Sequence, residues 1–384
     1  MKIVINAHSA KVGGGRTYLI NLLRRLPCGA DLAIELFAPA DLDVGADPRV
    51  ARVDTRWPVH NPLLRSLWER IALPRYLRRT GADVLFCPGG IVNTRAPEGV
   101  KIVTMFRNML PFDRVAAGHL GLGLARLRNR VQRSVMLRSM ASADLVIFIS
   151  AHARTVIEGM IRVRRAVVIP HGVAPQFRIA GAPPDRPPEA VAGPYLLYVS
   201  RFEAYKHHRE VIDAFAALAP AIASNLTLLL AGEADSAQGR HARAQIARLG
   251  LASRVKLLGG VAYDRLPALY AHAHAVIFAS SCENCPNILL EALGAGRPLL
   301  SSDVQPMPEF GGPDIAYFDP RDPRSLREAL ERVLTDPNHA AGLAAASLER
   351  SLQYDWDRTA RATWDTIAAL ARPDQGTSSE KLAA

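Results

Sequence analysis

Two glutamates eight positions apart, Glu283 and Glu291, are the residues of this chain that most clearly suggest chemistry. The apolar, β-prone segment 275–279 precedes them, and the helix-favouring segment 288–293 contains the second one. This order predicts that Glu283 lies in a strand-to-helix turn and Glu291 about two turns into the helix. In an open α/β sheet such a turn lies at the carboxyl ends of the strands, where ligands bind.

The chemistry of such a turn favours an anion that carries hydroxyl groups. Backbone amides of residues 284–288 would point at the ligand, and a helix N-terminus attracts anions such as phosphate. Carboxylates beside that anion would accept hydrogen bonds from hydroxyl groups. A phosphate together with hydroxyls indicates a nucleotide sugar or a similar compound. The alternative is structural: Glu283 caps a helix and Glu291 is a solvated helical residue.

Length and charge limit the classes of function. The 384 residues, 49% of them apolar, suit two domains that each have their own core. The net charge of +11 is uneven, because residues 1–190 carry 28 basic and 14 acidic residues and residues 191–384 carry 19 and 22. A basic first half suggests nucleic acid, an anionic membrane or a phosphorylated substrate as partner. No nucleic-acid-recognition motif occurs, so we expect no nucleic acid.

Nothing in the sequence predicts membrane insertion or secretion. No run of 18 or more apolar residues occurs, and the first ten residues lack the hydrophobic region of a signal peptide. Four cysteines are few for a secreted scaffold and fit a reducing compartment. We therefore expect a cytoplasmic protein, with peripheral contact to the inner face of the cytoplasmic membrane as an open alternative.

Strand-like and helix-like segments alternate through both halves, which is typical of doubly wound parallel sheets. The predicted strands are 2–7, 33–38, 84–87, 101–105, 145–149, 166–169, 195–199, 227–231, 255–258, 275–278 and 298–301. The Pro-rich segment 180–189 can continue neither element and predicts an interdomain linker. The sequence therefore predicts two Rossmann-like α/β domains, over residues 1–180 and 190–355.

Several motifs of this chain resemble those of the family-4 glycosyltransferases, retaining enzymes of the GT-B fold. The strongest is the Glu-x7-Glu block formed by Glu283 and Glu291. The phrase that contains Arg201 and Lys206 is similar to the family's strand-end Gly-Arg-x4-Lys motif. Further similar segments are 13–15, 170–173, 254–259, 269–270, 287–298 and 354–358. The resemblance extends over roughly residues 1–370.

The resemblance implies a GT-B architecture, in which the two domains face each other across a cleft. Residues 1–180 would form the acceptor-side domain and residues 190–355 the domain that binds the nucleotide sugar. Residues 356–372 would form a helix that packs back toward the N-terminal domain. Residues 373–384 would be a tail, and its last four residues look like a vector-encoded remnant.

The resemblance also implies roles for individual residues. Arg201 and Lys206 would bind the pyrophosphate and stabilise the departing nucleoside diphosphate, although on spacing alone they could be a solvated loop pair. Glu291 would accept hydrogen bonds from ribose, and Glu283 would lie beside the transferred sugar. The candidate catalytic residues are thus Glu283, Arg201 and Lys206. The other predicted donor contacts are Gly13, Gly14, Gly15, Gly232, Val261, Asn284, Cys285, Pro286, Asn287 and Ile288.

One segment departs from the family pattern. Many members have a histidine near the reacting sugar after the strand at 103–105, whereas this chain has Arg107 and Asn108. Asn108 is a candidate to hydrogen-bond the sugar, and Arg107 is a candidate to contact a phosphate at the sugar or acceptor side. We therefore expect front-face transfer with retention, in which a donor phosphate oxygen rather than a protein base takes the acceptor's proton.

We expect no metal and no bound cofactor besides the nucleoside diphosphate sugar as co-substrate, GDP- or UDP-linked. Cys282 and Cys285 form one C-x2-C pair, but a zinc site needs four ligands and the chain offers no second pair. Asp-x-Asp pairs at 41–43 and 355–357 lie outside the predicted cleft turns.

The segment 120–138 allows two interpretations. Its apolar residues recur at helical spacing: Leu120, Leu124, Leu127, Val131 and Val135. Its arginines lie largely off that stripe: Arg126, Arg128, Arg130, Arg133 and Arg138. One interpretation is an amphipathic helix packed on the core. The other is a helix on an anionic membrane surface, which would suit a lipid-linked acceptor.

Taken together, these features predict a metal-independent, retaining hexosyltransferase of polysaccharide or lipopolysaccharide biosynthesis. It would move a hexose-type sugar from a nucleoside diphosphate to a saccharide or lipid-linked glycan. Two alternatives stay open: a GT-B sugar-nucleotide epimerase, which needs acid–base groups at the sugar's C2, and a catalytically silent GT-B scaffold. The missing histidine favours the scaffold, whereas the intact charged motifs disfavour it.

Overall fold

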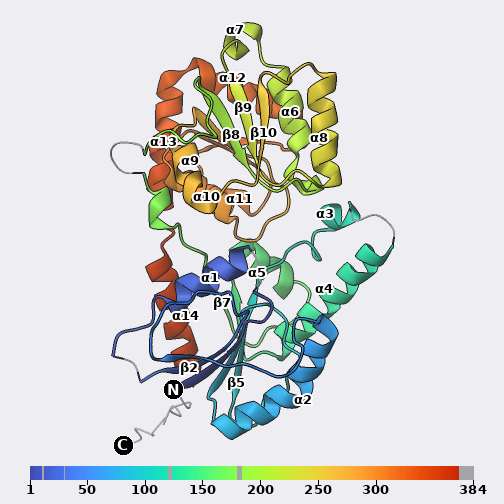
Figure 1. Ribbon diagram of the computed structural model, residues 1–384, viewed down its shortest axis with the longest axis vertical. Helices are drawn as coiled ribbons and strands as arrows, with labels where there is room; N and C mark the ends of the chain where they lie inside the picture. The colour runs from blue at the N-terminus through green and yellow to red at the C-terminus, as the bar shows by residue number, and fades with distance from the viewer. Residues whose placement is uncertain (11–12, 30, 120–122, 180–183, 372–384) are drawn as a thin grey trace, which may run out of the picture.

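The chain folds into two α/β domains stacked along the long axis of the molecule (Figure 1). The computed structural model describes residues 1–10, 13–29, 31–119, 123–179 and 184–371. Each domain is built on one parallel sheet with helices on both faces, so the prediction of two Rossmann-like α/β domains is confirmed. The expected tail, residue 120 and part of the expected linker lie outside the described residues.

The N-terminal domain has a seven-stranded sheet in the order β3-β2-β1-β4-β5-β6-β7. Its strands are β1 (Lys2–Asn6), β2 (Ala33–Phe37), β3 (Val50–Arg52), β4 (Val84–Cys87), β5 (Lys101–Phe106), β6 (Leu145–Phe148) and β7 (Ala166–Val168). Its helices are α1 (Gly14–Leu23), α2 (Pro62–Thr80), α3 (Arg114–Gly118), α4 (Leu124–Ser142) and α5 (Ala151–Glu158). Ile3, Val4 and Ile5 are fully buried, because helices cover both faces of the parallel sheet. Strands in such a sheet are therefore apolar throughout.

The C-terminal domain has a six-stranded sheet in the order β10-β9-β8-β11-β12-β13. Its strands are β8 (Tyr195–Val199), β9 (Thr227–Ala231), β10 (Val255–Gly259), β11 (Ala275–Phe278), β12 (Leu299–Ser302) and β13 (Ala316–Phe318). Its helices are η1 (Pro175–Phe177), η2 (Ala204–Lys206), α6 (His208–Ala216), α7 (Pro220–Ala223), α8 (Ala237–Arg248), η3 (Tyr263–Arg265), α9 (Leu266–Ala271), α10 (Asn287–Gly294), α11 (Met307–Gly311), α12 (Pro323–Thr335) and α13 (Pro337–Ser351).

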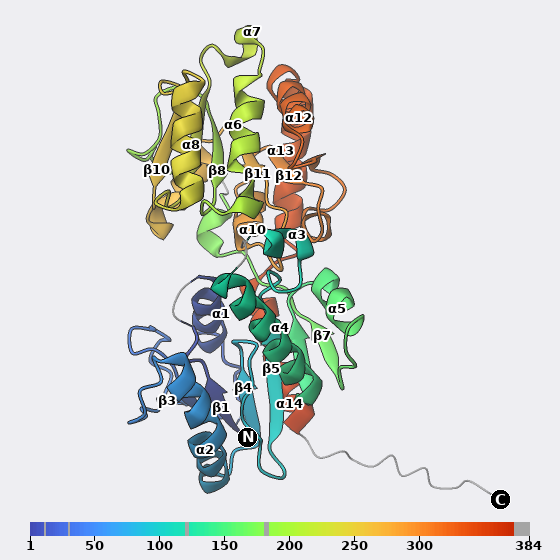
Figure 2. The same cartoon turned by 90° about the vertical axis from the view of Figure 1, so that its right-hand side faces the viewer.

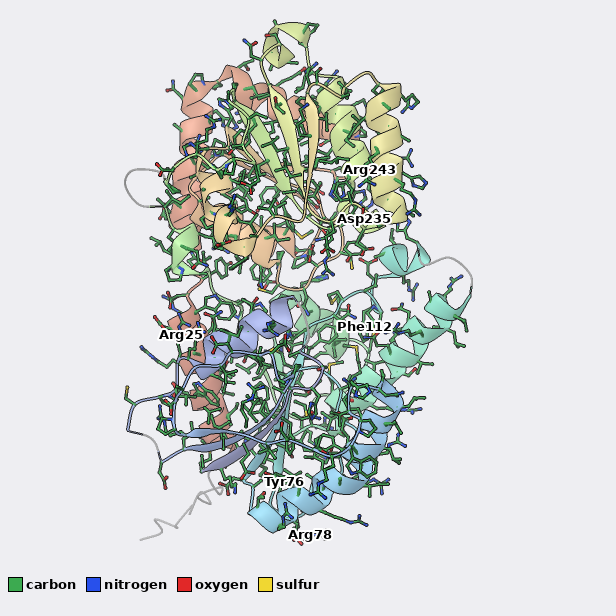
Figure 3. The ribbon with its side chains drawn as sticks, in the orientation of Figure 1. Arg25, Tyr76, Arg78, Phe112, Asp235 and Arg243 are labelled. Atoms are coloured by element: carbon green, nitrogen blue, oxygen red, sulfur yellow. The ribbon has the colours of Figure 1, made fainter. Side chains whose placement is uncertain are left out.

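The last helix, α14 (Trp356–Ala371), belongs to the core of the N-terminal domain. Its Trp356 and Trp364 are buried among residues of β1, β2 and α1. The indole nitrogen of Trp364 donates to the backbone oxygen of Arg25 at 3.1 Å. Arg25, labelled in Figure 3, also pairs with Asp357 at 2.6 Å. The polypeptide thus passes between the domains twice, once before β8 and once before α14, so two chain segments connect the domains.

Two local expectations were wrong for identifiable reasons. Pro286 caps α10, which therefore begins at Asn287, so Glu291 lies about one turn into the helix rather than two. The edge strands β3 and β13 were not predicted, since each has only three residues and five of their six residues are not buried.

The first half of α4 is exposed, so the interpretation that its apolar stripe packs on the core is wrong there. Leu124, Leu127 and Val131 are 85%, 58% and 54% exposed. The helix instead packs through Met136 and Met140, which lie later and on another face. Figure 2 shows α4 on the outer side of the domain, with α2 beside it. Among the described residues, no helix is long and apolar enough to cross a membrane.

Candidate functional site

Two loops of the C-terminal domain bring Lys206 and Glu283 into contact. Lys206 ends the short helix η2 after β8, and Glu283 lies in the turn between β11 and α10. The hydroxyl of Tyr198, within β8, donates to the backbone oxygen of Lys206 at 2.7 Å and holds this loop against the sheet. The ammonium of Lys206 donates to Oε1 of Glu283, and both side chains are largely buried. The interpretation of Lys206 as a solvated loop residue is therefore wrong.

Further contacts fix the two loops relative to each other. The amide of Ser281 donates to the backbone oxygen of Tyr205 at 2.9 Å. The hydroxyl of Ser281 lies 2.7 Å from Nε2 of His207. His207 has a left-handed backbone with φ of 50°, which costs a non-glycine residue about 1 kcal/mol. Such strain is characteristic of positions whose geometry the surrounding structure enforces.

Arg201 differs from Lys206 in its surroundings. It follows β8 directly, its side chain is exposed, and it forms no ion pair in the described part of the chain. Burial raises the pKa of Tyr205, nearby Glu283 raises it further, and the positive charge of Arg201 opposes that rise. Arg201 and Glu283 therefore both lie close to Tyr205. The predicted cation pair thus consists of one buried, paired lysine and one exposed arginine.

Glu291 is buried on the inner side of α10, so its interpretation as a solvated helical residue is wrong. Burial raises the pKa of its carboxyl to about 8, although a hydrogen bond from the Tyr263 hydroxyl at 3.0 Å opposes the rise. Tyr263 comes from η3 and no sequence motif indicated it, because only the fold brings it to Glu291. A largely neutral carboxyl that already accepts from one hydroxyl is suited to bind further hydroxyl groups.

This raised pKa predicts an unusual dependence of stability on pH. Between about pH 4.5 and pH 8 the folded protein keeps a proton on Glu291 that the unfolded chain has lost, so stability falls as pH rises through this window. Glu291→Gln removes this titration. The free energy of unfolding of the variant, relative to that of wild type, should therefore rise by on the order of 3 kcal/mol from pH 5 to pH 8. Urea unfolding of both proteins at these pH values measures the difference.

Glu349→Gln is the matched control, because Glu349 is an exposed helical glutamate of the same domain. It should follow the pH dependence of the wild type. If Glu291→Gln also follows the wild type, the buried, proton-retaining state of Glu291 is contradicted.

The turn before α10 connects the two domains. The side chain of Asn284 is buried: its Oδ1 accepts from the Ser150 hydroxyl at 2.9 Å, and its Nδ2 donates to the backbone oxygen of Phe106 at 3.1 Å. Ser150 and Phe106 belong to the N-terminal domain, so the side chain of Asn284 bridges the domains. The backbone amides of residues 284–288 were predicted to point at the ligand. Pro286 cannot contribute, because it has no amide hydrogen.

Cys285 and Asn287 of this turn contact the N-terminal domain as well. Cys285 is half-buried between the cores of both domains. Oδ1 of Asn287 lies 2.8 Å from Nδ1 of His171, whose pKa burial and the charge of Arg107 lower to about 3. Ile288 is half-buried against the C-terminal core. No side chain caps the first turn of α10, which leaves its amides oriented toward the cleft.

Arg107 lies against the N-terminus of α1, beneath Gly14 and Gly15. A methyl group on Gly15 would come within 2.5 Å of Nη1 of Arg107, and one on Gly14 would lie 3.2 Å from Nδ2 of Asn287. The glycines therefore allow Arg107, α1 and α10 to approach one another. Gly13 has φ of 69° and caps α1 without a side-chain hydrogen bond. Two uncapped helix N-termini and one guanidinium thus converge between the domains.

The guanidinium of Arg107 lacks an acidic partner in the described part of the chain. Its Nε is buried without a hydrogen bond there. Burial lowers its pKa to about 10, and the nearby groups of Tyr18 and Cys285 offset this only partly. Arg107 is therefore still charged at neutral pH. A half-buried positive charge beside two helix N-termini is suited to hold an anion.

Three predicted residues are explained by local structure instead. Oδ1 of Asn108 accepts from the amide of Leu110 at 3.1 Å, which leaves its Nδ2 for other contacts. Gly232 is required because a methyl group there would lie 1.9 Å from the backbone oxygen of Ser200. Val261 is half-buried against the C-terminal core. None of these contacts connects them to the cluster around Glu283.

The acidic and cysteine motifs have other partners or positions. Asp41 and Asp43 pair with Arg16 and Arg24, and Asp355 and Asp357 pair with Arg178 and Arg25. Cys282 is a free thiol buried among hydrophobic residues of the N-terminal domain, and burial raises its pKa. No group of three or more metal-ligating side chains occurs within the described ranges.

Sequence reasoning also missed a second contact between the domains. The carboxylate of Glu309, at the start of α11, accepts from the amides of Ala151 and His152 at 2.7 and 2.9 Å. It thereby caps the N-terminus of α5 from across the cleft. Neither residue type nor spacing signals such a contact, because the two partners lie in different domains.

Two family models match this chain, one on each domain. The model described as Glycosyltransferase Family 4 matches residues 12–177. The model described as Glycosyl transferases group 1 matches residues 185–350.

Comparisons with individual proteins agree with these matches. The serotype-specific mannosyltransferase WbdA of Escherichia coli is 27% identical over 184 residues, which are 48% of this chain and 23% of WbdA. The chain spans less than half the length of the curated relatives it matches.

Solved structures share the fold over almost the whole chain. Sucrose-phosphate synthase from Thermosynechococcus elongatus superimposes with a TM-score of 0.76 at 19% identity, covering 96% of this chain and 98% of that one. Anabaena Alr3699/HepE in complex with UDP and glucose gives 0.70 at 22% identity, covering 96% and 100%. This chain therefore belongs to the family-4 glycosyltransferases and has the GT-B fold.

Proposed function

We propose that this protein transfers a hexose from a nucleoside diphosphate sugar to a saccharide or lipid-linked glycan, with retention of configuration and without a metal ion. The convergence of Arg107 with the uncapped N-termini of α1 and α10 supports this function most strongly. Such a site is suited to a diphosphate, which carries the charge that must be neutralised when the bond to the sugar breaks. HepE, which shares the fold, binds UDP and glucose.

The cations of the site would neutralise the charge of the diphosphate, as a metal ion does in other transferases. The ammonium of Lys206 and the guanidinium of Arg201 would hold the diphosphate from the C-terminal domain, and Arg107 from the N-terminal domain. Glu283 would keep Lys206 in place and accept from a sugar hydroxyl with its other oxygen. Glu291 would accept from the ribose, next to Tyr263.

No protein base is required for this transfer. His171 lies near Arg107, but burial and that charge lower its pKa to about 3, which makes it a weak base, and Asn108 does not titrate. We propose that an oxygen of the departing phosphate takes the proton of the acceptor hydroxyl on the same face of the sugar. The bond from the anomeric carbon to the phosphate breaks as the bond to the acceptor oxygen forms, which retains the configuration.

Thermal-shift measurements with UDP, GDP and their glucose and mannose derivatives test the donor. At least one diphosphate should raise the melting temperature, and the matching sugar should be turned over equally well with and without EDTA. A protein that responds to no nucleotide would be a silent scaffold. Release of an epimerised nucleotide sugar would identify an epimerase, and EDTA-sensitive turnover restored by a divalent ion would contradict the metal-free proposal.

We also propose that α4 contacts an anionic membrane surface, where a lipid-linked acceptor would be found. Leu124, Leu127 and Val131 form an exposed apolar stripe, and arginines flank it. Arg133 is not part of that surface, because its guanidinium lies over the ring of Phe112. Apolar residues beside arginines are typical of helices that lie in a membrane interface.

Leu127→Asp should weaken binding to phosphatidylglycerol-containing vesicles by about tenfold, because it removes a leucine from the buried face and adds a like charge. Co-sedimentation measures the binding. Leu352→Asp is the matched control, since Leu352 is 59% exposed in the C-terminal domain against 58% for Leu127. Equal binding by all three proteins would contradict the role of α4.

A further inference from the structure

A groove between α2 and α4 carries an arrangement of arginines that the transfer reaction does not use. It has a volume of about 1010 Å³ and is lined by Arg70 of α2, by Val135 and Arg138 of α4, and by Arg95 and Arg164 of neighbouring segments. Small-molecule sites typically enclose roughly 300–1,000 Å³, so the groove can hold a compact ligand. The residues at its base precede β5, β6 and β7, so it lies at the end of the sheet opposite the cleft.

The groove is positively charged, since most of its arginines lack counterions. Arg164 pairs with Asp144 at 3.2 Å. Arg70, Arg95 and Arg138 form no ion pair among the described residues, and all three are exposed. Three unpaired guanidinium groups around one hollow are suited to a phosphate group, which accepts hydrogen bonds from their planar forks.

The outer face of α4 leads directly into this groove. Leu124, Val131, Val135 and Arg138 recur at spacings of seven, four and three, so they share one face of the helix. The first part of this face is exposed and apolar, and its last part forms a wall of the groove.

The second wall has the same pattern. On α2, Leu63 and Leu67 are 81% and 43% exposed, and Arg70 follows three residues later on the same face. Figure 2 shows α2 and α4 together on one side of the N-terminal domain. Both helices thus combine exposed leucines with an arginine at a shared groove.

We propose that this groove binds the phosphate headgroup of an anionic phospholipid while the leucines of α2 and α4 enter the membrane interface. The site rests on the membrane contact proposed above and deepens it, because it adds a second helix and a specific headgroup position. Apolar residues that reach the acyl boundary and arginines at the phosphate level match the layered chemistry of one leaflet. Neither a soluble phosphate nor a nucleic acid would explain the exposed leucines on both walls.

The test compares Arg70→Gln/Arg138→Gln with Arg162→Gln/Arg165→Gln, a charge-matched control on exposed arginines outside the groove. On mixed phosphatidylcholine–phosphatidylglycerol vesicles, the groove variant should bind about tenfold to thirtyfold more weakly than wild type, and the control should lose clearly less. On pure phosphatidylcholine vesicles the proteins should not differ. The thermal shift produced by the nucleoside diphosphate should be the same in all of them.

Three outcomes would contradict the proposal that the groove binds a phospholipid headgroup. Equal losses in the groove variant and its control would mean general charge attraction. Loss in Leu127→Asp with none in the groove variant would leave the membrane contact intact but remove the headgroup site. Calorimetric binding of inorganic phosphate to wild type but not to Arg70→Gln/Arg138→Gln, without any vesicle binding, would identify a site for a soluble anion instead. Loss of the nucleotide response would affect the proposed function separately.

Discussion

Lys206→Ala should lower kcat by about a hundredfold to a thousandfold, the range found when one preorganised charge that faces a developing negative charge is removed. The ammonium of Lys206 is held by Glu283 and by the hydroxyl contact of Tyr198 to its backbone, so it needs little reorganisation during transfer. Because the missing charge acts on the departing diphosphate, the loss should appear in kcat rather than mainly in KM. Steady-state kinetics with the donor identified by thermal shift measure both constants.

The design of this test must separate chemistry from folding. Removing Lys206 leaves the largely buried carboxylate of Glu283 without its cation, which destabilises a protein. Lys206→Met/Glu283→Gln removes both charges and should unfold at a temperature close to that of wild type, yet remain inactive. Lys256→Ala, a change of an exposed lysine in the same domain, should leave kcat unchanged. A folded Lys206→Ala protein with wild-type turnover would refute the role of this lysine.

Arg107→Met should lower kcat/KM by about a hundredfold while leaving the protein at least as stable as wild type. This combination follows from the surroundings of Arg107, whose half-buried guanidinium has no acidic partner among the described residues. A buried charge without a counterion costs stability, so an apolar side chain of similar length is tolerated or favoured there. Kinetics and urea unfolding of the same preparation measure the two effects.

Two variants sharpen the conclusion about Arg107. Arg165→Met, at an exposed arginine of the same domain, should change neither property. Gly15→Ala places a methyl group at the Nη1 atom of Arg107 and should reduce activity by displacing the guanidinium. If Arg107→Met destabilises the protein by several kcal/mol and keeps its activity, Arg107 has a structural role and the anion site is wrong.

Much of the fold could be predicted because its strands are buried on both faces. The segments of β8, β9 and β11 are continuous apolar runs, and their bounds were predicted to the residue. Edge strands such as β13 bury less and leave a weaker pattern. The same limit applies to α4, because an apolar stripe looks alike on a core helix and on a surface helix. Only the tertiary structure shows that Leu124 is exposed.

The site could be predicted in its residue types but not in its contacts. Motifs indicated Lys206 and Glu283 separately, yet their ion pair joins loops 77 positions apart. Arg107 lies far in sequence from Gly15, and Tyr263 far from Glu291, so no spacing rule connects them. Protonation depends on burial as well, which is why the raised pKa of Glu291 emerges only from the folded protein.

We propose that cations from both domains act on one diphosphate in the crevice between them. Isothermal titration calorimetry of a nucleoside diphosphate and of its parent nucleoside measures what the phosphates contribute. We predict that wild type prefers the diphosphate by about a hundredfold or more, as charge-assisted hydrogen bonds would give. We further predict that Lys206→Met/Glu283→Gln and Arg107→Met each remove most of that preference while still binding the nucleoside. An undiminished preference in either variant would contradict the claim.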